Sequence, residues 1–145
     1  MNTKLCALKF MYNMERFATQ IYLTQRRAFR GSEIEGRLTK ASANEQEHVD
    51  LLRKRTIELK ERPSRIGFLF QLAGIIVGFA TLCLGRKFVM KAGIRVERRA
   101  IRDYNSFIKR LDFDGETVSL LKQIITDEER HVETWQNSLK ELRRK

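Results

Sequence analysis

The chain has 145 residues, enough for one domain with a substantial core, and a net charge of +11 at pH 7. Its two cysteines, Cys6 and Cys83, lie far apart and form no CxxC pair, which excludes a disulfide framework and a rubredoxin-type iron–sulfur centre and indicates a reducing compartment. The positive charge attracts polyanions, either nucleic acid or an anionic membrane surface, unless salt simply screens it.

The sequence predicts four long helices and one uncharged segment. Residues 4–29 form the first helix, with no sustained apolar run that would indicate a secretory signal. GSEIEG then breaks the pattern, and Ser32 and Glu35 have capping-box spacing for a second helix that runs to about residue 62, where Pro63 ends it. Residues 66–85 carry no charge. A helix over about 86–111, the turn DFDGE and a helix from about 116 to near the C-terminus complete an all-α chain, because no alternating run indicates a sheet.

Each long helix carries an apolar stripe at three- and four-residue spacing, and each stripe contains one glutamate. Both histidines of the chain lie in such stripes, three residues after a glutamate, where a solvated charge would not normally lie. The inward polar residues predicted in this way are Glu15, Glu45, His48, Glu97, Glu128 and His131.

The two halves of the chain follow one plan. The turn near Gly31 lies about midway between Glu15 and Glu45, and the turn near Phe113 lies about midway between the glutamates of the second half. In an antiparallel hairpin, nearly equal arms bring two residues to the same height. Each half therefore places two glutamates and one histidine at one level of the bundle.

Four carboxylates buried together require a compensating cation. Two divalent ions would balance their charge, and a set of imidazoles and carboxylates without thiolates suits iron or manganese. One glutamate from each of two helices with Glu-x-x-His from each of two others is the pattern of ferritin-like di-iron and di-manganese bundles. The sequence thus predicts one ferritin-like four-helix bundle domain over residues 1–145. Tyr22 and Tyr104 also face the predicted site, either as core residues with bonded hydroxyls or with a function, and Tyr104 is the candidate catalytic residue.

The uncharged segment is long enough to span a membrane, but a span would separate the two halves of the metal site. We therefore expect it to be a crossover between parallel second and third long helices. Because it is apolar on all sides, part of it must face a bilayer surface, a long apolar substrate, a partner protein or an oligomer interface. The flanking arginines and lysines suit anionic headgroups. The candidate substrate- and membrane-binding residues are Phe68, Phe70, Leu72, Ile75, Ile76 and Phe79.

Motifs along nearly the whole chain resemble the demethoxyubiquinone hydroxylase family, the di-iron monooxygenases of ubiquinone biosynthesis. MERFATQIYLTQ is similar to the family's first-helix motif, and EQEHVDLL and DEERH match its two Glu-x-x-His motifs. The more specific part is RPSRIGFLFQLAGIIVGFATLCLGRKFVMKAGIRVE, which resembles the family's Arg-Pro and Gly-rich apolar segment. The family usually has histidine before the tyrosine that matches Tyr104, whereas this chain has Asp103, so its catalysis, reductant or substrate could differ.

The resemblance implies two iron ions rather than manganese. Carried over by position, one ion has the ligands Glu15, Glu45 and His48, the other has Glu97, Glu128 and His131, and Glu45 and Glu128 are able to bridge. The implied activity is hydroxylation of a demethoxyubiquinone-type polyprenyl quinol by dioxygen, with a reductant such as NADH.

The resemblance also implies a setting. We expect a peripheral protein on an anionic membrane surface, at the cytoplasmic face of a bacterial inner membrane or the matrix face of a mitochondrial one. A lipid-binding or ubiquinone-biosynthesis partner protein and a homo-oligomer fit this setting, and no nucleic-acid partner is expected. The alternatives are ferritin-like iron oxidation, rubrerythrin-like peroxide reduction, or a non-catalytic membrane-associated helical protein.

Overall fold

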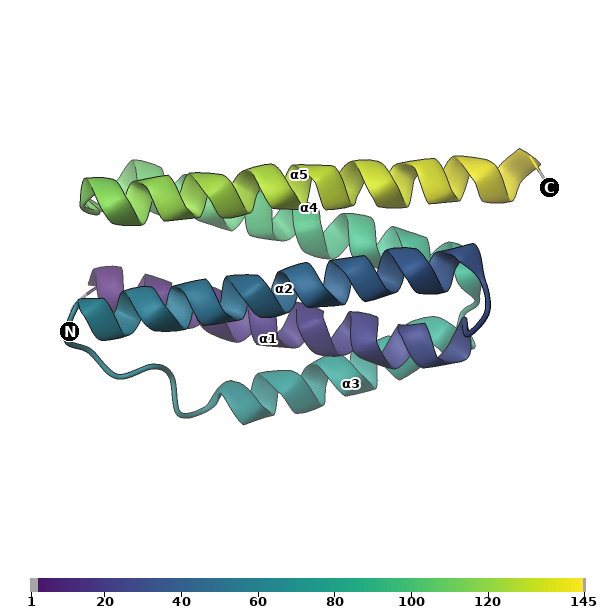
Figure 1. Cartoon of the computed structure of the whole chain (residues 1–145), viewed down its shortest axis with the longest axis horizontal. Helices are drawn as coiled ribbons and strands as arrows, with labels where there is room; N and C mark the ends of the chain where they lie inside the picture. The colour runs from purple at the N-terminus through teal and green to yellow at the C-terminus, as the bar shows by residue number, and fades with distance from the viewer. Residues whose placement is uncertain (1–2, 145) are drawn as a thin grey trace.

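A computed structural model describes residues 3–144, and every regular element within that range is a helix, as predicted (Figure 1). The helices are α1 (Thr3–Ala28), α2 (Glu33–Glu58), α3 (Gly67–Cys83), α4 (Arg86–Arg110) and α5 (Gly115–Arg144). Helices α1 and α2 form one antiparallel hairpin and α4 and α5 form another, while α3 packs on the outside of α1. Since α3 runs back along the bundle, α2 and α4 are parallel, which confirms the predicted crossover.

The turn between α1 and α2 has the predicted capping box. The backbone N–H of Glu35 donates to Oγ of Ser32 at 3.3 Å, and the Glu35 carboxylate accepts from the backbone N–H of Gly31 at 2.6 Å. Gly31 has a φ of 78°, a conformation that glycine adopts at little cost. This turn fixes the arm length of the first hairpin and thereby the height of its glutamates.

The end of α2 differs from the prediction. The helix ends at Glu58, four residues earlier than expected, and Lys60 takes a positive φ of 59° that turns the chain away from the helix axis. Leu59, an apolar residue, therefore lies past the last turn and is 40% exposed. Pro63 follows the helix end and does not itself terminate the helix.

The buried face of α3 consists of three glycines and one threonine, Gly67, Gly74, Gly78 and Thr81. A Cβ at Gly78 would lie 2.8 Å from Cβ of Thr24, and one at Gly74 would overlap the carbonyl oxygen of Phe17. The glycines thus allow the backbones of α3 and α1 to approach closely. Arg16 on α1 adds a side-chain hydrogen bond to Gln71 of 2.6 Å, which fixes the position of α3 along α1.

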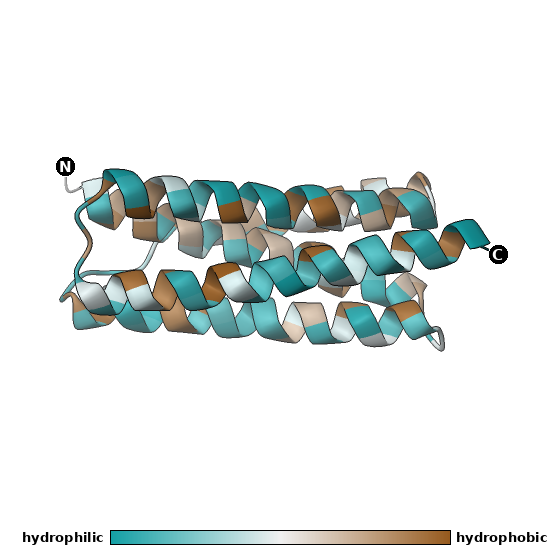
Figure 2. Ribbon diagram, turned by 90° about the horizontal axis from the view of Figure 1, so that it is seen from above, coloured by the Kyte–Doolittle hydropathy of each residue, from teal (hydrophilic) through white to brown (hydrophobic). Residues whose placement is uncertain are grey.

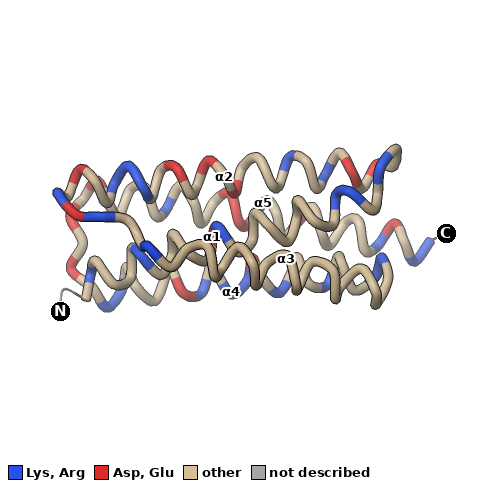
Figure 3. The backbone as a smooth tube through the Cα atoms, turned by 90° about the horizontal axis from the view of Figure 1, so that it is seen from below, with Lys and Arg blue, Asp and Glu red and all other residues tan. Residues whose placement is uncertain are grey.

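The opposite face of α3 is apolar and exposed. Figure 3 shows the helix without a charged residue, between basic residues in the preceding loop and at the start of α4. We call its exposed apolar residues, together with those at its two ends, the α3 ridge: Ile66, Phe68, Leu69, Leu72, Ile76, Phe79, Leu84 and Phe88. Phe70 and Ile75 are half-buried. Within residues 3–144, no helix is both long and apolar enough to cross a membrane.

The core of the bundle is divided in two. Apolar residues recur at intervals along otherwise hydrophilic helices (Figure 2) and form two clusters. One contains Met11 and Val49, and the other contains Ile21 and Ala41. Glu15 and His48 fall between these pairs along α1 and α2, so the predicted polar level lies between two apolar clusters.

The packing of α3 predicts that Gly74→Ala destabilises the protein by about 1–3 kcal/mol, because the added methyl group meets the backbone of α1. Gly36→Ala is the matched control: Gly36 lies within α2 with no neighbouring atom near its missing Cβ, so the substitution should stabilise by about 0.5–1 kcal/mol. Urea unfolding followed by circular dichroism measures both changes. Equal stability of the Gly74→Ala variant and the wild type would contradict the close contact.

Candidate metal centre

The structure brings all six predicted polar residues to one place between the two hairpins. They form two groups of four, and within each group one ligand atom per residue lies within 4.8 Å of the others. The groups are Glu15, Glu45, His48 and Glu128, and Glu45, Glu97, Glu128 and His131. Because Glu45 and Glu128 belong to both groups, they lie where carboxylates that bridge two ions would have to be.

Burial of the cluster follows from the helical pattern. Each Glu-x-x-His pair lies on one face of its helix because residues three apart are neighbours there. The four glutamates are at most 2% exposed, and His48 is fully buried. His131 is the most accessible member, with 12% of its side chain exposed.

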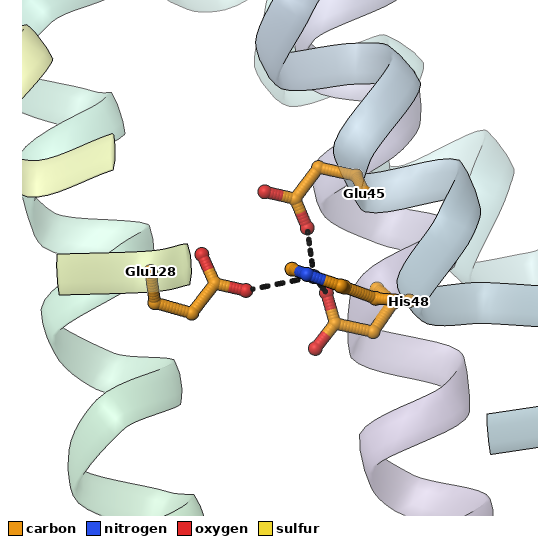
Figure 4. Close-up of side chains that lie close together, drawn as sticks. Glu45, His48 and Glu128 are labelled. Carbon is orange, nitrogen blue, oxygen red and sulfur yellow. Dashed lines mark ion pairs between the residues drawn. The ribbon is translucent and has the colours of Figure 1, made fainter. Parts of the chain in front are cut away.

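The Nδ1 atom of His48 faces the first group (Figure 4). It lies 3.1 Å from Oε1 of Glu128, 3.7 Å from Oε2 of Glu15 and 3.8 Å from Oε2 of Glu45. Figure 4 shows Glu45 and Glu128 approaching this nitrogen from different helices. The imidazole thus presents one nitrogen to three carboxylates.

His131 has the corresponding position in the second group. Its Nδ1 atom lies 3.0 Å from Oε2 of Glu128, 3.1 Å from Oε1 of Glu45 and 3.7 Å from Oε1 of Glu97. The two imidazole rings are 6.4 Å apart between centroids. The shared glutamates therefore lie between two histidines, each of which has its own terminal glutamate.

The donor atoms fit a pair of metal ions. Both carboxylate oxygens of Glu45, Nδ1 of His48 and Oε1 of Glu128 are buried and have no hydrogen-bond partner within the described chain. Nδ1 of His48 and Oε1 of Glu128 are close, but their angles are not those of a hydrogen bond. Buried polar atoms without partners are costly, whereas oxygen and nitrogen atoms that converge in this way match the ligand preferences of iron and manganese.

The electrostatics of the cluster also favour bound cations. Burial, together with the charges of Glu45 and Glu128, raises the pKa of Glu15 well above its usual value, and the pKa of Glu97 is raised by the same causes. Burial alone would lower the pKa of His131, but the neighbouring carboxylates of Glu128 and Glu45 outweigh it and raise that pKa to about 9. Glu15, Glu97 and His131 therefore hold their protons tightly in the absence of a cation, and a divalent ion can replace these protons.

Two tyrosines hold the terminal glutamates. The hydroxyl of Tyr104 on α4 donates to Oε1 of Glu15, and the hydroxyl of Tyr22 on α1 donates to Oε1 of Glu97. Burial and the charge of Glu97 raise the pKa of Tyr22, which keeps this hydroxyl protonated. Each tyrosine thus links a carboxylate to the opposite hairpin. The Tyr22 hydroxyl in turn accepts a hydrogen bond of 3.1 Å from Nε1 of Trp135.

Asp103 lies at the edge of the site and not among the ligands. Its carboxylate accepts a 2.7 Å bond from Nε of Arg99 on the same helix. Both residues border a small, mainly apolar cavity of about 20 Å³ between α1 and α4, which Tyr104 and the terminal glutamates also line. The position where the resemblance leads us to expect histidine is therefore part of the lining of this cavity.

Asp127 is a residue of the site that the helical periodicity did not predict. This buried carboxylate on α5 lies 3.2 Å from Nε2 of His48, on the side of the ring away from the glutamates, and Arg130 contacts its other oxygen. Asp127 directly precedes Glu128 and falls outside the inward stripe. In the sequence, only its position directly before the second Glu-x-x-His motif could have indicated a role for Asp127.

Two glutamates that follow Glu128 on α5 fall outside the inward stripe, which predicts that they lie in solvent. Glu129 and Glu133 are exposed.

Comparisons with known proteins agree with this architecture. Residues 10–144 match the model of the family described as ubiquinone biosynthesis protein COQ7. Among solved structures, a dodecameric thioferritin, the bacterioferritin-related protein from Bacteroides fragilis, aligns with a TM-score of 0.77 and 18% identity over 98% of this chain and 87% of that chain. This likeness confirms the ferritin-like helical bundle.

A search of curated protein sequences finds no match. The family match nevertheless covers nearly the whole chain, including all six clustered residues and the apolar crossover. It confirms the resemblance inferred from the motifs: the chain belongs to the family of the ubiquinone biosynthesis protein COQ7.

Proposed function

We propose that this protein is a di-iron monooxygenase that hydroxylates the ring of a demethoxyubiquinone-type polyprenyl quinol. The observation that carries the proposal is the buried cluster of four glutamates and two histidines with two shared carboxylates, in a chain of a ubiquinone-biosynthesis family. In the proposed reaction, one oxygen atom of dioxygen enters a ring C–H bond and the other leaves as water. Two electrons and two protons come from outside, with NADH or a partner protein as the electron source.

The chain's own residues would hold two iron ions in the two groups described above. When bound, the ions would supply the reduction of dioxygen that ring hydroxylation requires. The apolar clusters on both sides of the polar level exclude water from it. Tyr104 and Tyr22 fix the terminal carboxylates, and the Tyr104 hydroxyl is also the proposed proton donor nearest the small apolar cavity.

The cavity between α1 and α4 is the proposed approach for the reactants. Its lining is mainly apolar, with Phe10, Met14 and Val96 among its residues. Its volume of about 20 Å³ suits a molecule of the size of dioxygen. A quinol ring is larger, so its binding would require movement of Phe10 or of the Arg99–Asp103 pair at the mouth.

The α3 ridge is the proposed contact for a bilayer and for the isoprenoid tail. Such an exposed row of large apolar side chains marks an interaction surface. The flanking basic residues Arg62, Arg65, Arg86 and Lys87 suit anionic headgroups. A peripheral location on an inner membrane follows from this proposal, and a partner protein or a second copy of the chain would compete for the same surface.

Iron binding should depend on the two shared ligands. Glu45→Ala or Glu128→Ala removes a carboxylate that both ions require, so iron content should fall from about two ions per chain to less than one. The exposed neighbour Glu129 provides the control, and Glu129→Ala should retain full iron content. Elemental analysis of protein reconstituted anaerobically with ferrous iron measures the difference. If both ligand variants kept the full iron content, the iron would have to bind at another place in the chain.

Hydroxylation of the quinol ring can be followed directly. The iron-loaded protein, given a reductant, demethoxyubiquinol and ¹⁸O-labelled dioxygen, should form a hydroxylated quinol with one labelled oxygen atom, detected by mass spectrometry. Glu128→Ala should form none. Oxidation of iron without a hydroxylated product would reject the substrate and indicate ferritin-like iron oxidation, with the metal centre intact.

Membrane binding should depend on the α3 ridge. Replacing Phe68, Ile76 and Phe79 together by serine should weaken binding to vesicles containing anionic lipid by about tenfold or more, because less apolar surface leaves water. Ile57→Ser is the control, because Ile57 is also exposed but lies on α2. Vesicle sedimentation gives both affinities. If the triple variant bound vesicles as tightly as the wild type, the α3 ridge would not be the membrane contact.

A further inference from the structure

The two histidines of the metal centre differ on their outer sides. Nε2 of His48 lies 3.2 Å from Oδ2 of Asp127, which is itself buried and contacted by Arg130 through its other oxygen. A carboxylate at this position accepts the Nε2 proton and leaves the Nδ1 lone pair directed at the glutamates. The ring orientation and tautomer that a metal ligand needs are therefore set by the protein.

His131 has no equivalent support. Among residues 3–144, no side chain forms a hydrogen bond with its Nε2 atom. The residue that precedes the other Glu-x-x-His motif, in the position corresponding to Asp127, is Asn44. Asn44 and His131 line a cavity of about 380 Å³ between α2 and α5, which Asp127 and Arg130 also line. His131 thus reaches this cavity directly, whereas His48 does not line it and is fully buried.

We propose that Asp127 is a positioning residue for His48 and that it makes the two metal positions unequal. The position formed by Glu15, Glu45 and His48 binds first and tightly. The position formed by Glu97, Glu128 and His131 binds more weakly and exchanges its ion through the cavity beside His131. This inference rests on the metal centre of the proposed function, but not on its substrate.

Cobalt(II) titration of chelator-stripped protein tests the inequality. Wild type should show two classes of site, one tighter than the other. Asp127→Ala should weaken the tighter class about 10- to 100-fold, the range typical for loss of a partner of a ligating histidine, and leave the weaker class nearly unchanged. Asp127→Asn keeps an oxygen that can accept the Nε2 proton, so it should lose less affinity. Asn44→Ala, at the corresponding position, should alter the tight class little.

Double variants assign the effect to one histidine. In a His131→Ala background, Asp127→Ala should still weaken the remaining site, whereas in a His48→Ala background it should have almost no further effect. The visible absorption of bound cobalt(II) reports the loss of nitrogen coordination in the same samples. If Asp127 had a purely structural role, Asp127→Ala would weaken cobalt binding equally in both backgrounds.

The possible results distinguish failure of this inference from failure of the proposed function. Two equally tight classes in wild type, an Asp127→Ala variant with wild-type affinities, or an effect that follows His131 would each overturn the inference and leave the proposed function standing. Failure of the wild type to bind cobalt would overturn both. Circular dichroism confirms folding of each variant. If Asp127→Ala does not fold, Asp127→Leu decides, because leucine has a similar size but accepts no hydrogen bond, and wild-type affinity in its tight class would reject the role of Asp127.

Discussion

Four carboxyl groups share one buried level of this bundle, and that arrangement is stable only when positive charge shares it. Much of the structure near this level serves that constraint. Two imidazoles point one nitrogen each at the shared glutamates. Tyrosines from the opposite hairpins hold the terminal carboxylates. Apolar clusters on both sides exclude water, which would otherwise screen the charges. A pair of divalent ions satisfies these requirements together.

The crossover helix has a separate structural role. It has to return along the bundle, and its glycine face lets it lie directly on α1 without disturbing the residues that face the metal centre. Its large side chains consequently point outward. One helix thus connects the two halves of the centre and exposes an apolar surface beside them, which places the proposed tail-binding surface and the proposed reaction site in one small domain.

The sequence predicted those features that depend on helical periodicity and chain length. Equal hairpin arms placed Glu15 beside Glu45, and three-residue spacing placed His131 beside Glu128. Features that depend on contacts between helices could not be predicted from the sequence. Asp127 falls outside the apolar stripe of α5, yet it is buried and contacts His48 of α2. The outward exposure of Leu59 depends on a local backbone turn that no periodicity encodes.

The central claim is that this chain holds two metal ions in one shared-ligand centre. X-ray absorption at the iron edge of the reconstituted wild-type protein tests it most directly. The account predicts a first coordination shell of oxygen and nitrogen only, with iron–iron scattering at about 3.5–4 Å, the usual separation in two-metal sites. Isolated single iron ions, or sulfur in the first shell, would contradict it.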